Sequence, residues 1–294
     1  MLFRSIHPVV LPVLAGLGWN LAGLPLPTVA EIAFRIPKTG GVYVYVEELY
    51  GKALGFVCGW VQVLIYGPGL MAALALYFGS LCAQFFGLPA TRQKPIALIA
   101  LYLLAAINAR SASASGALSA ATTALKLLPI AAIGVAGLAL GNAPIFGLEL
   151  PGAAKAAGMG AAVLACLWAY DGWMQVANIA GEIDQPARNL PRALVLGLAT
   201  VMAAYLLVNL SLFHVLDPGQ IASLNEKAAA VASERLFGSL GGKLLSLGIL
   251  VSIFGCLNGN ILTLTRVLFA IARRGAFPLR EHFATLHKSY QTPV

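Results

Sequence analysis

The chain has 294 residues, of which 59% are hydrophobic and only 10% are charged, whereas about a quarter of the residues in an ordinary soluble domain are charged. Its mean hydropathy is +0.84. Because so few charged side chains cannot coat a soluble globule of this length, the composition excludes a disordered chain, a collagen-like fibre and a secreted disulfide scaffold. It predicts a polytopic membrane protein, whose first partner is the lipid bilayer.

The formal net charge is +8, and the basic residues lie between apolar runs rather than in one patch. This distribution argues against a nucleic-acid partner and is better explained by membrane topology. The positive-inside rule favours an external N-terminus, which suggests that a further helix precedes residue 1. We expect a multi-pass protein of the cytoplasmic (inner) cell membrane.

Seven apolar segments are long enough to cross roughly 30 Å of hydrocarbon as helices that rise 1.5 Å per residue. They lack the alternating apolar and polar pattern of membrane barrel strands, so the expected fold class is all-α with about seven transmembrane helices. In the second segment, Gly67-Pro68-Gly69 is expected to bend the helix. The segments lie near residues 8–34, 53–86, 95–109, 119–140, 158–181, 190–216 and 243–272.

The fifth segment contains Trp168-Ala169-Tyr170-Asp171-Gly172-Trp173 near its centre. Glycine costs about 1 kcal/mol in a helix and aspartate competes for backbone hydrogen bonds, so this sequence weakens an α-helix. One interpretation is a kinked but continuous helix whose Asp171 faces a partner. The other is a discontinuous helix whose freed N–H and C=O groups line a cavity for a polar substrate.

Lys126 lies about five residues into the fourth predicted segment. A lysine near a helix end can extend its ammonium group to the membrane surface, which is one interpretation. A lysine at a helix centre in lipid costs ~2.5–3.5 kcal/mol or more, and such residues usually serve a function. The alternative is therefore a fixed cation inside the bundle, which replaces a bound sodium ion or exchanges a proton.

Two asparagines, in Cys256-Leu257-Asn258-Gly259-Asn260, lie early in the seventh segment. Asparagine side chains in lipid need hydrogen-bond partners, either on a neighbouring helix or at a substrate cavity, and both interpretations remain open. The four cysteines are expected to be small buried hydrophobic residues. These cysteines are Cys58, Cys82, Cys166 and Cys256.

The sequence contains no arrangement of side chains that is typical of a catalytic or metal centre. Its histidines have neither i,i+4 pairing nor metal-ligand spacing, and no nucleophile motif, phosphate-binding loop or paired carboxylates is present. We therefore expect neither an enzyme, nor a metal site, nor a bound cofactor. The histidines are His7, His214, His282 and His287.

Several motifs resemble those of the amino acid–polyamine–organocation transporter superfamily, especially bacterial relatives of the L-type amino acid transporters and of the serine/threonine exchangers. The resemblance covers nearly the whole chain, and its combination of motifs is specific. The motifs are Ile36–Tyr45, Ile107–Lys126, Trp168–Trp173 with the following Gly181–Ala193, Arg266–Pro278 and His287–Val294.

The resemblance implies a LeuT-type inverted repeat of five plus five helices, in which the first helix of each repeat is broken and substrate binds between the breaks. The predicted segments would be helices two to eight of that fold, in a single incomplete transmembrane domain over residues 1–294. Residues 1–140 would be the remainder of the first repeat (helices two to five). Residues 158–294 would begin the second repeat (helices six to eight).

The resemblance also assigns roles to individual residues. Lys126 would occupy the place where sodium-coupled relatives keep an ion. The substrate-binding residues would be Trp168, Ala169, Tyr170, Asp171 and Gly172 at the break, Cys256 and Asn260 on the eighth helix, and Gln62 and Tyr66 on the third.

The family's first helix, with its Gly-Ser-Gly-type break, and the helices after the eighth have no counterpart in the sequence. We therefore interpret the chain as a fragment that does not transport on its own. The complete protein would be a secondary active transporter (permease) of amino acids, either a sodium-independent exchanger or a proton-linked one, that works by alternating access and could form a homodimer. The alternative from another class is a seven-helix membrane receptor or sensor.

Overall fold

The structure is a computed structural model, which describes residues 31–36, 38–144, 169–170, 172–224, 227–275, 280–287 and 292. All the elements assigned within these residues are helices, and five of them are long and apolar enough to cross a membrane. The predicted all-α, polytopic class is therefore confirmed. The predicted segment 8–34 lies almost wholly outside the described residues, as does the first part of 158–181.

The five spans end within a residue of the predicted ends, but α7 begins seven residues earlier than predicted. Residues 112–118 contain three alanines, which form helix readily, but the segment as a whole carries little hydropathy because serine and glycine lie between them. Ser111 caps this start, because the N–H of Ala114 donates to its Oγ at 3.0 Å. The spans are Lys52–Phe85 (α4 Lys52–Val61, η2 Gln62–Tyr66 and α5 Gly67–Phe85), α6 (Gln93–Arg110), α7 (Ala112–Leu140), α9 (Pro186–Val215) and α12 (Ser239–Arg273).

Shorter helices connect or flank these spans. Helix α3 precedes α4, η3 precedes α6, and η5, a 3-10 helix, precedes α9. Two short helices lie between α9 and α12, and one follows α12. Their bounds are α3 Gly41–Tyr50, η3 Ala90–Arg92, η5 Trp173–Glu182, α10 Pro218–Leu224, α11 Ala228–Phe237 and α13 Arg280–Phe283.

The chain divides into two compact units, which are described separately. The described residues of the first unit come from Leu127–Trp173 and Val195–Gly248. Those of the second come from Val29–Lys126, Met174–Leu194 and Ile249–Val294.

In the first unit, α7 and α9 pack closely because small residues lie where the two helices meet. A Cβ on Gly134 would meet the side chain of Leu207, and a Cβ on Gly137 would meet Ser211. Ser211 also donates a hydrogen bond from Oγ to the carbonyl of Ile133 at 2.8 Å. Small residues and interhelical hydrogen bonds of this kind hold membrane helices together.

The end of α9 packs against the two short helices that follow it. The side chains of Phe213, Leu216, Ile221, Ala228 and Ala232 form a buried apolar cluster there. This cluster fixes α10 and α11 on the end of α9.

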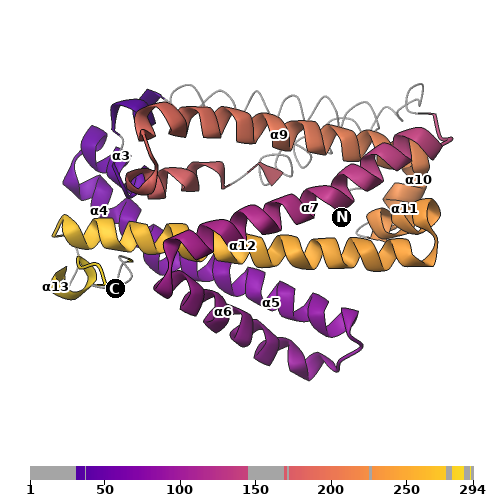
Figure 1. Cartoon of the computed structure of the whole chain (residues 1–294), viewed down its shortest axis with the longest axis horizontal. Coiled ribbons are helices and arrows are strands. Elements are labelled where there is room, and N and C mark those ends of the chain that lie inside the picture. The colour runs from indigo at the N-terminus through magenta and orange to yellow at the C-terminus, as the bar shows by residue number, and fades with distance from the viewer. Residues whose placement is uncertain are drawn as a thin grey trace, which may run out of the picture. The chain divides into compact units, whose positions relative to one another are not determined.

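In the second unit, α5 and α6 form an antiparallel hairpin (Figure 1). Gly79 permits the close approach, since a Cβ at this position would meet the backbone of Gln93. A second set of contacts joins the hairpin to α12. The buried members of this cluster are Ala75, Ala97, Leu104, Leu257 and Ile261.

Helix α3 packs against the C-terminal part of α12 in the same unit. Tyr43 and Val44 of α3 share a buried cluster with Val267, Ala270 and Ile271 of α12. The apolar face of α3 is thus covered, and its glutamates remain available to the basic residues beside them.

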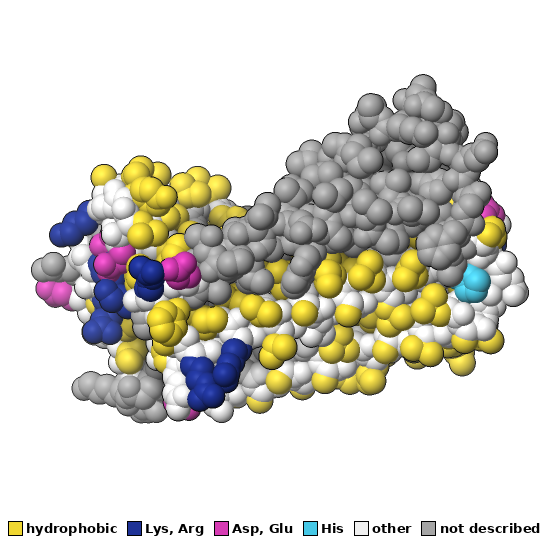
Figure 2. Space-filling model, turned by 90° about the horizontal axis from the view of Figure 1, so that it is seen from above, with side chains coloured by type: hydrophobic (Ala, Val, Ile, Leu, Met, Phe, Trp, Pro, Cys, Tyr) yellow, Lys and Arg dark blue, Asp and Glu magenta, His cyan; other side chains and the backbone are white. Residues whose placement is uncertain are grey.

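Charged side chains lie around the contact between α3 and α12. Figure 2 shows charged side chains gathered at one end of the described surface in view, and apolar side chains along the helices. The guanidinium of Arg274 lies 3.2 Å from Glu47 and 3.0 Å from Glu48. Lys38 donates to the same Glu48 carboxylate at 2.9 Å. Hydrogen bonds from Lys38 and Arg274 lower the pKa of Glu48 below its usual value of 4.5.

Candidate functional site

The predicted helix break is found at Gly172. Its φ of +94° lies outside the right-handed helical region, and the chain continues as the 3-10 helix η5 rather than as an α-helix. In the described residues the backbone is therefore broken here, as the discontinuous interpretation expected, and the substrate cavity that it also expected stays a prediction. Trp168 and Asp171, also predicted to bind substrate, lie outside the described residues.

Just before the break, Ala169 and Tyr170 lie in the first unit. The carbonyl of Ala169 accepts a hydrogen bond from the hydroxyl of Tyr205 at 2.8 Å, and the ring of Tyr170 packs edge-on against the Tyr205 ring at 5.3 Å between centroids. Tyr170 is buried. The Tyr205 side chain of α9 thus provides a hydrogen-bond partner for a backbone carbonyl beside the break.

In the second unit, Gln62 and Tyr66 belong to the π-helix η2, the widened turn directly before Pro68. A proline ring clashes with the carbonyl four residues earlier, here that of Leu64, and a wider turn relieves this clash. The predicted irregularity at Gly67-Pro68-Gly69 is therefore found one turn earlier, as a π-helix. Such turns are frequent at functional sites.

A polar bridge joins Tyr66 to α12 through a residue that the sequence analysis did not single out. Gln175 of η5 donates from Nε2 to the Tyr66 hydroxyl at 3.3 Å, and it accepts at Oε1 from Thr263 Oγ1 at 3.0 Å. Thr263 also has the Gly259 carbonyl within reach, at 2.9 Å. Three helices far apart in the sequence meet at this one amide.

Cys256 and Asn260 lie on the same face of α12 as Thr263, because residues spaced by four and three positions share a helix face. Asn260 donates from Nδ2 to the Cys256 carbonyl at 2.9 Å. Its Oδ1 is buried and has no hydrogen-bond partner among the described residues. An unsatisfied buried acceptor is costly, so this oxygen marks a position where a donor would be stabilised.

Lys126 is not near a helix end, as one interpretation supposed. It lies fourteen residues from either end of α7, about 21 Å along the axis, and its side chain is half-buried. The expected position near a helix end is therefore wrong, and the role of this lysine stays a prediction. No salt bridge to Lys126 is found among the described residues, and it interacts electrostatically with Cys256 at the midpoint of α12.

Asn258 takes the other role that the sequence left open, that of a contact between helices. Its Oδ1 accepts from Asn108 Nδ2 of α6 at 2.9 Å, and its Nδ2 donates to Ser119 Oγ of α7 at 2.8 Å and to the Ser115 carbonyl at 2.9 Å. Ser115 in turn donates to Asn108 Oδ1 at 2.7 Å. These residues form a hydrogen-bonded contact among α6, α7 and α12.

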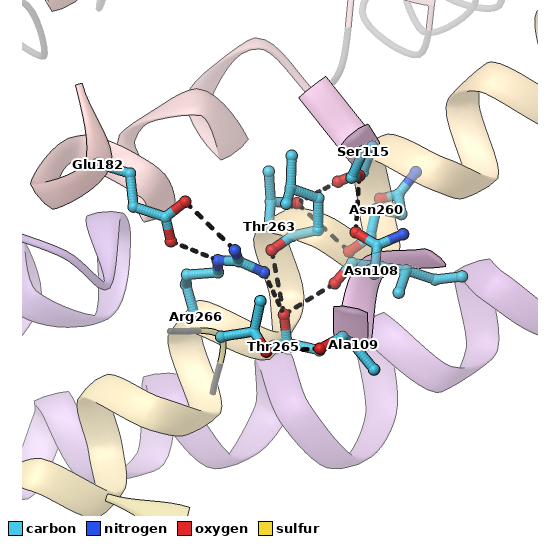
Figure 3. Close-up of polar contacts among 12 residues, drawn as sticks. Asn108, Ala109, Ser115, Glu182, Asn260, Thr263, Thr265 and Arg266 are labelled. Atoms are coloured by element: carbon cyan, nitrogen blue, oxygen red, sulfur yellow. Dashed lines mark hydrogen bonds and ion pairs between the residues drawn. The ribbon is translucent and has the colours of Figure 1, made fainter. Parts of the chain in front are cut away.

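Further along α12, Arg266 forms a bidentate ion pair with Glu182 at the end of η5 (Figure 3). Nε donates to Oε1 at 2.6 Å and Nη2 to Oε2 at 3.2 Å. The side chain of Arg266 is only 2% exposed, whereas that of Glu182 is 40% exposed. Sequence reasoning placed both residues in family motifs but could not pair them across 84 positions.

The expectation that the cysteines are buried is wrong for those that the structure describes. Cys256 is exposed and Cys58 and Cys82 are half-buried, because small residues on membrane helices can face lipid or a cavity as well as a neighbouring helix. Among the described residues, no group of three His, Cys, Asp or Glu side chains could hold a metal ion.

The family model described as amino acid permease matches residues 7–294 of the chain. The chain belongs to the amino acid permease family. It is 47% identical to the serine/threonine exchanger SteT of Bacillus subtilis (strain 168) over 266 residues, which are 90% of this chain and 60% of that protein.

More distant relatives include human transporters. The b(0,+)-type amino acid transporter 1 is 30% identical over 263 residues, or 87% of this chain and 54% of that protein. The large neutral amino acids transporter small subunit 2 is 30% identical over 276 residues, or 90% of this chain and 51% of that protein. The chain thus spans between about half and three fifths of the length of these relatives.

Family membership and the five apolar helices identify a multi-pass protein of the cell membrane. The matched proteins are named as permeases, exchangers and transporters, so the chain is not an enzyme. Nothing in these similarities favours the receptor alternative.

Proposed function

We propose that this chain forms part of a secondary active transporter that exchanges amino acids across the cell membrane by alternating access. The observation that carries the proposal is that polar residues lie at the middle of three apolar spans. Lys126 and Cys256 lie at the midpoints of α7 and α12, and η2 lies in the middle part of the span Lys52–Phe85. Polar groups at that depth are costly in lipid and typically form transport sites.

The substrate-binding residues that we propose are the predicted ones in each unit, together with those of the polar bridge in the second unit. Backbone groups at the Gly172 break would bind the carboxylate or the amine of a zwitterion, as freed helix ends do in transporters of this kind. Asn260 would offer its unpaired oxygen to a substrate donor. The remaining proposed members are Trp168, Ala169, Tyr170, Asp171, Cys256, Gln62 and Tyr66.

The substrates that we propose are small neutral amino acids, with serine and threonine first. The support is the printed activity of the relative with 47% identity, a serine/threonine exchanger. Backbone recognition of the shared amine and carboxylate also suits exchange, since each amino acid can displace another at one site.

Lys126 is proposed to act as a fixed cation in place of a bound sodium ion. Lys126 lies at the middle of α7 without an ion-pair partner among the described residues, and a permanent positive charge there would serve the electrostatic role of a metal ion. This role predicts transport that is independent of sodium.

The repeat assignment is also a proposal. Residues 1–140 would belong to the first repeat and residues 158–294 to the second, in the LeuT-type arrangement. The break at Gly172 supports this division, because it lies where the second repeat would begin.

A homodimer is not proposed. The human relative that matches 90% of this chain is named as a small subunit, and that name does not match an assembly of identical chains.

The test is counterflow in liposomes that contain the complete purified protein. Vesicles loaded with unlabelled serine should accumulate external radiolabelled serine, whereas vesicles without internal amino acid should not. Replacing sodium by choline should leave the rate unchanged. Uptake no faster than in protein-free liposomes, with correctly inserted protein, would contradict the proposal.

A further inference from the structure

Arg266 is a buried cation on the polar face of α12. Its side chain is 2% exposed, and its partner at the far end of η5, Glu182, supplies both carboxylate oxygens. Burying the guanidinium costs desolvation free energy, which its hydrogen bonds to the half-exposed Glu182 carboxylate offset only in part, so this contact is weak evidence for stability and fits a switching or positioning role.

The position of this pair along α12 is informative. Cys256 and Asn260 lie near the middle of the helix, and Arg266 lies between them and the helix end at Arg273. That end adjoins Arg274 and Lys38, whose positive charges mark it as cytoplasmic by the positive-inside rule. The pair therefore lies between the mid-membrane polar residues and the cytoplasmic surface.

The segment that carries Glu182 is flanked by backbone that leaves the helical region. Helix η5 is bounded by Gly172, with φ of +94°, and by Gln185, with φ of +44°, and Ile179 inside it departs from helical geometry. Backbone that leaves the helical region at both ends of a short element is where large dihedral changes are absorbed in conformational switching.

Two polar contacts join η5 to α12 in the described part of the chain. They are the hydrogen bond between Gln175 and Thr263 and the ion pair between Glu182 and Arg266. The two apolar clusters described for this unit, around Val267 and around Leu257, contain no residue of η5. Polar contacts of this kind can be exchanged for water, whereas an interdigitated apolar contact resists separation.

We propose that the Glu182–Arg266 pair is a cytoplasmic latch, which holds η5 against α12 while the site is closed on that side and opens once in every transport cycle. This inference rests on the proposed function. Opening breaks both charge-assisted hydrogen bonds, and water entering from the cytoplasm then solvates the carboxylate and the guanidinium. Glu182 and Arg266 are positioning residues and need not touch the substrate.

The test measures the accessibility of the native thiol at Cys256 from the cytoplasmic side. The complete protein, with Cys58, Cys82, Cys166 and any cysteine outside residues 1–294 changed to serine, is placed in inside-out vesicles and treated with a membrane-impermeant thiol reagent. Glu182→Gln keeps the side-chain shape but removes the charge. It should raise the labelling rate of Cys256 about tenfold, which corresponds to ~1.4 kcal/mol of latch free energy.

The matched control is Glu48→Gln, which breaks an ion pair with Arg274 at the same end of the protein but not the latch. It should leave the labelling rate unchanged. If Glu182→Gln fails to fold, Glu182→Asp, which keeps the charge on a shorter side chain, should give an intermediate rate. A folded Glu182 variant that labels at the unmodified rate, or an equal rise in the Glu48 control, would overturn the latch.

Labelling requires no transport, so this result is separate from the counterflow result. If counterflow fails, the amino acid exchange function is wrong. If counterflow succeeds but the labelling rates do not differ, the latch alone is wrong.

Discussion

Asn108 on α6 and Asn258 on α12, 150 positions apart, are joined by a buried hydrogen bond of 2.9 Å from the amide nitrogen of Asn108 to the amide oxygen of Asn258. Both side chains are almost wholly inaccessible, at 4% and 0% exposure. The same Asn258 bonds to α7 through Ser119. One side chain therefore ties three membrane-spanning helices together.

Asn258→Ala should lower stability. The change leaves the buried amide of Asn108 and the hydroxyl of Ser119 without their partner, and each lost interhelical bond in a membrane protein costs about 0.6–1.7 kcal/mol. Thermal unfolding of the purified protein in detergent would measure the loss. Thr200→Ala is the control, since Thr200 is exposed and bonds only to its own helix at Leu196; equal melting temperatures for the two variants would contradict the prediction.

Gly172→Ala should reduce exchange strongly. A residue with a Cβ pays of order 1–3 kcal/mol at a φ of +94°, so the chain would be drawn towards a regular helix and the break would close. Initial rates of labelled serine counterflow would measure the effect. Gly197→Ala, in the open middle of α9, is the matched control and should keep the rate, because alanine is the better helix former.

The paired change of Asp171-Gly172 to Leu-Ala should abolish uptake altogether. It removes both residues that disfavour an α-helix at this point. Undiminished transport in this variant would show that the break is not needed for the site.

Lys126→Ala should slow exchange at saturating substrate and leave the folded protein intact. The ammonium group lies at the midpoint of α7 with no salt-bridge partner in the described part of the chain, so its removal costs little folding free energy while the fixed charge is lost. Counterflow measured between pH 5 and 8 would test this role. Lys243→Ala, at an exposed lysine near the start of α12, should behave as the unmodified protein; if Lys126→Ala does the same at every pH, the fixed-cation role fails.

Glu48→Gln should destabilise the protein at neutral pH but not in acid. The pKa of Glu48 is lowered below 4.5 in the folded state, so its ion pairs contribute stability above the unfolded pKa, and this contribution is lost as the pH falls through the folded pKa. The melting temperatures of the two proteins should therefore converge as the pH falls through the lowered pKa of Glu48 in the folded state. A constant difference across the pH range would show that the titration of Glu48 does not stabilise the fold.

The sequence predicted the all-α class and the ends of the spans well because both depend on hydropathy, which is local. It misplaced the start of α7, since Ala112–Leu118 forms helix without being strongly apolar. That error placed Lys126 near a helix end, although it lies at the middle of α7. The break near Gly172 was one of two open interpretations, because a single Gly-Asp pair only biases the backbone.

The contacts that organise the candidate site could not be predicted from one sequence. Gln175, Thr263 and Glu182 are ordinary polar residues in their own segments, and their significance comes from partners between 84 and 109 positions away. Asn258 and Asn260 are likewise alike in sequence. They differ only because two residues on a helix turn by about 200°, which sends one towards α6 and α7 and the other to the face of Cys256 and Thr263.

The π-helix at Gln62–Tyr66 sets the angular phase of the whole span Lys52–Phe85. A π turn holds one more residue than an α turn, so each residue on its far side is rotated by about 100° relative to an unbroken α-helix. Deleting a single residue from this turn would leave composition and hydropathy almost unaltered. It would nevertheless rotate one part of the span relative to the other: either the part from Tyr66 onwards would turn away from Gln175, or the part that contains Cys58 would turn around the helix axis. A single helical wheel therefore describes this span only up to residue 61 or only from residue 67.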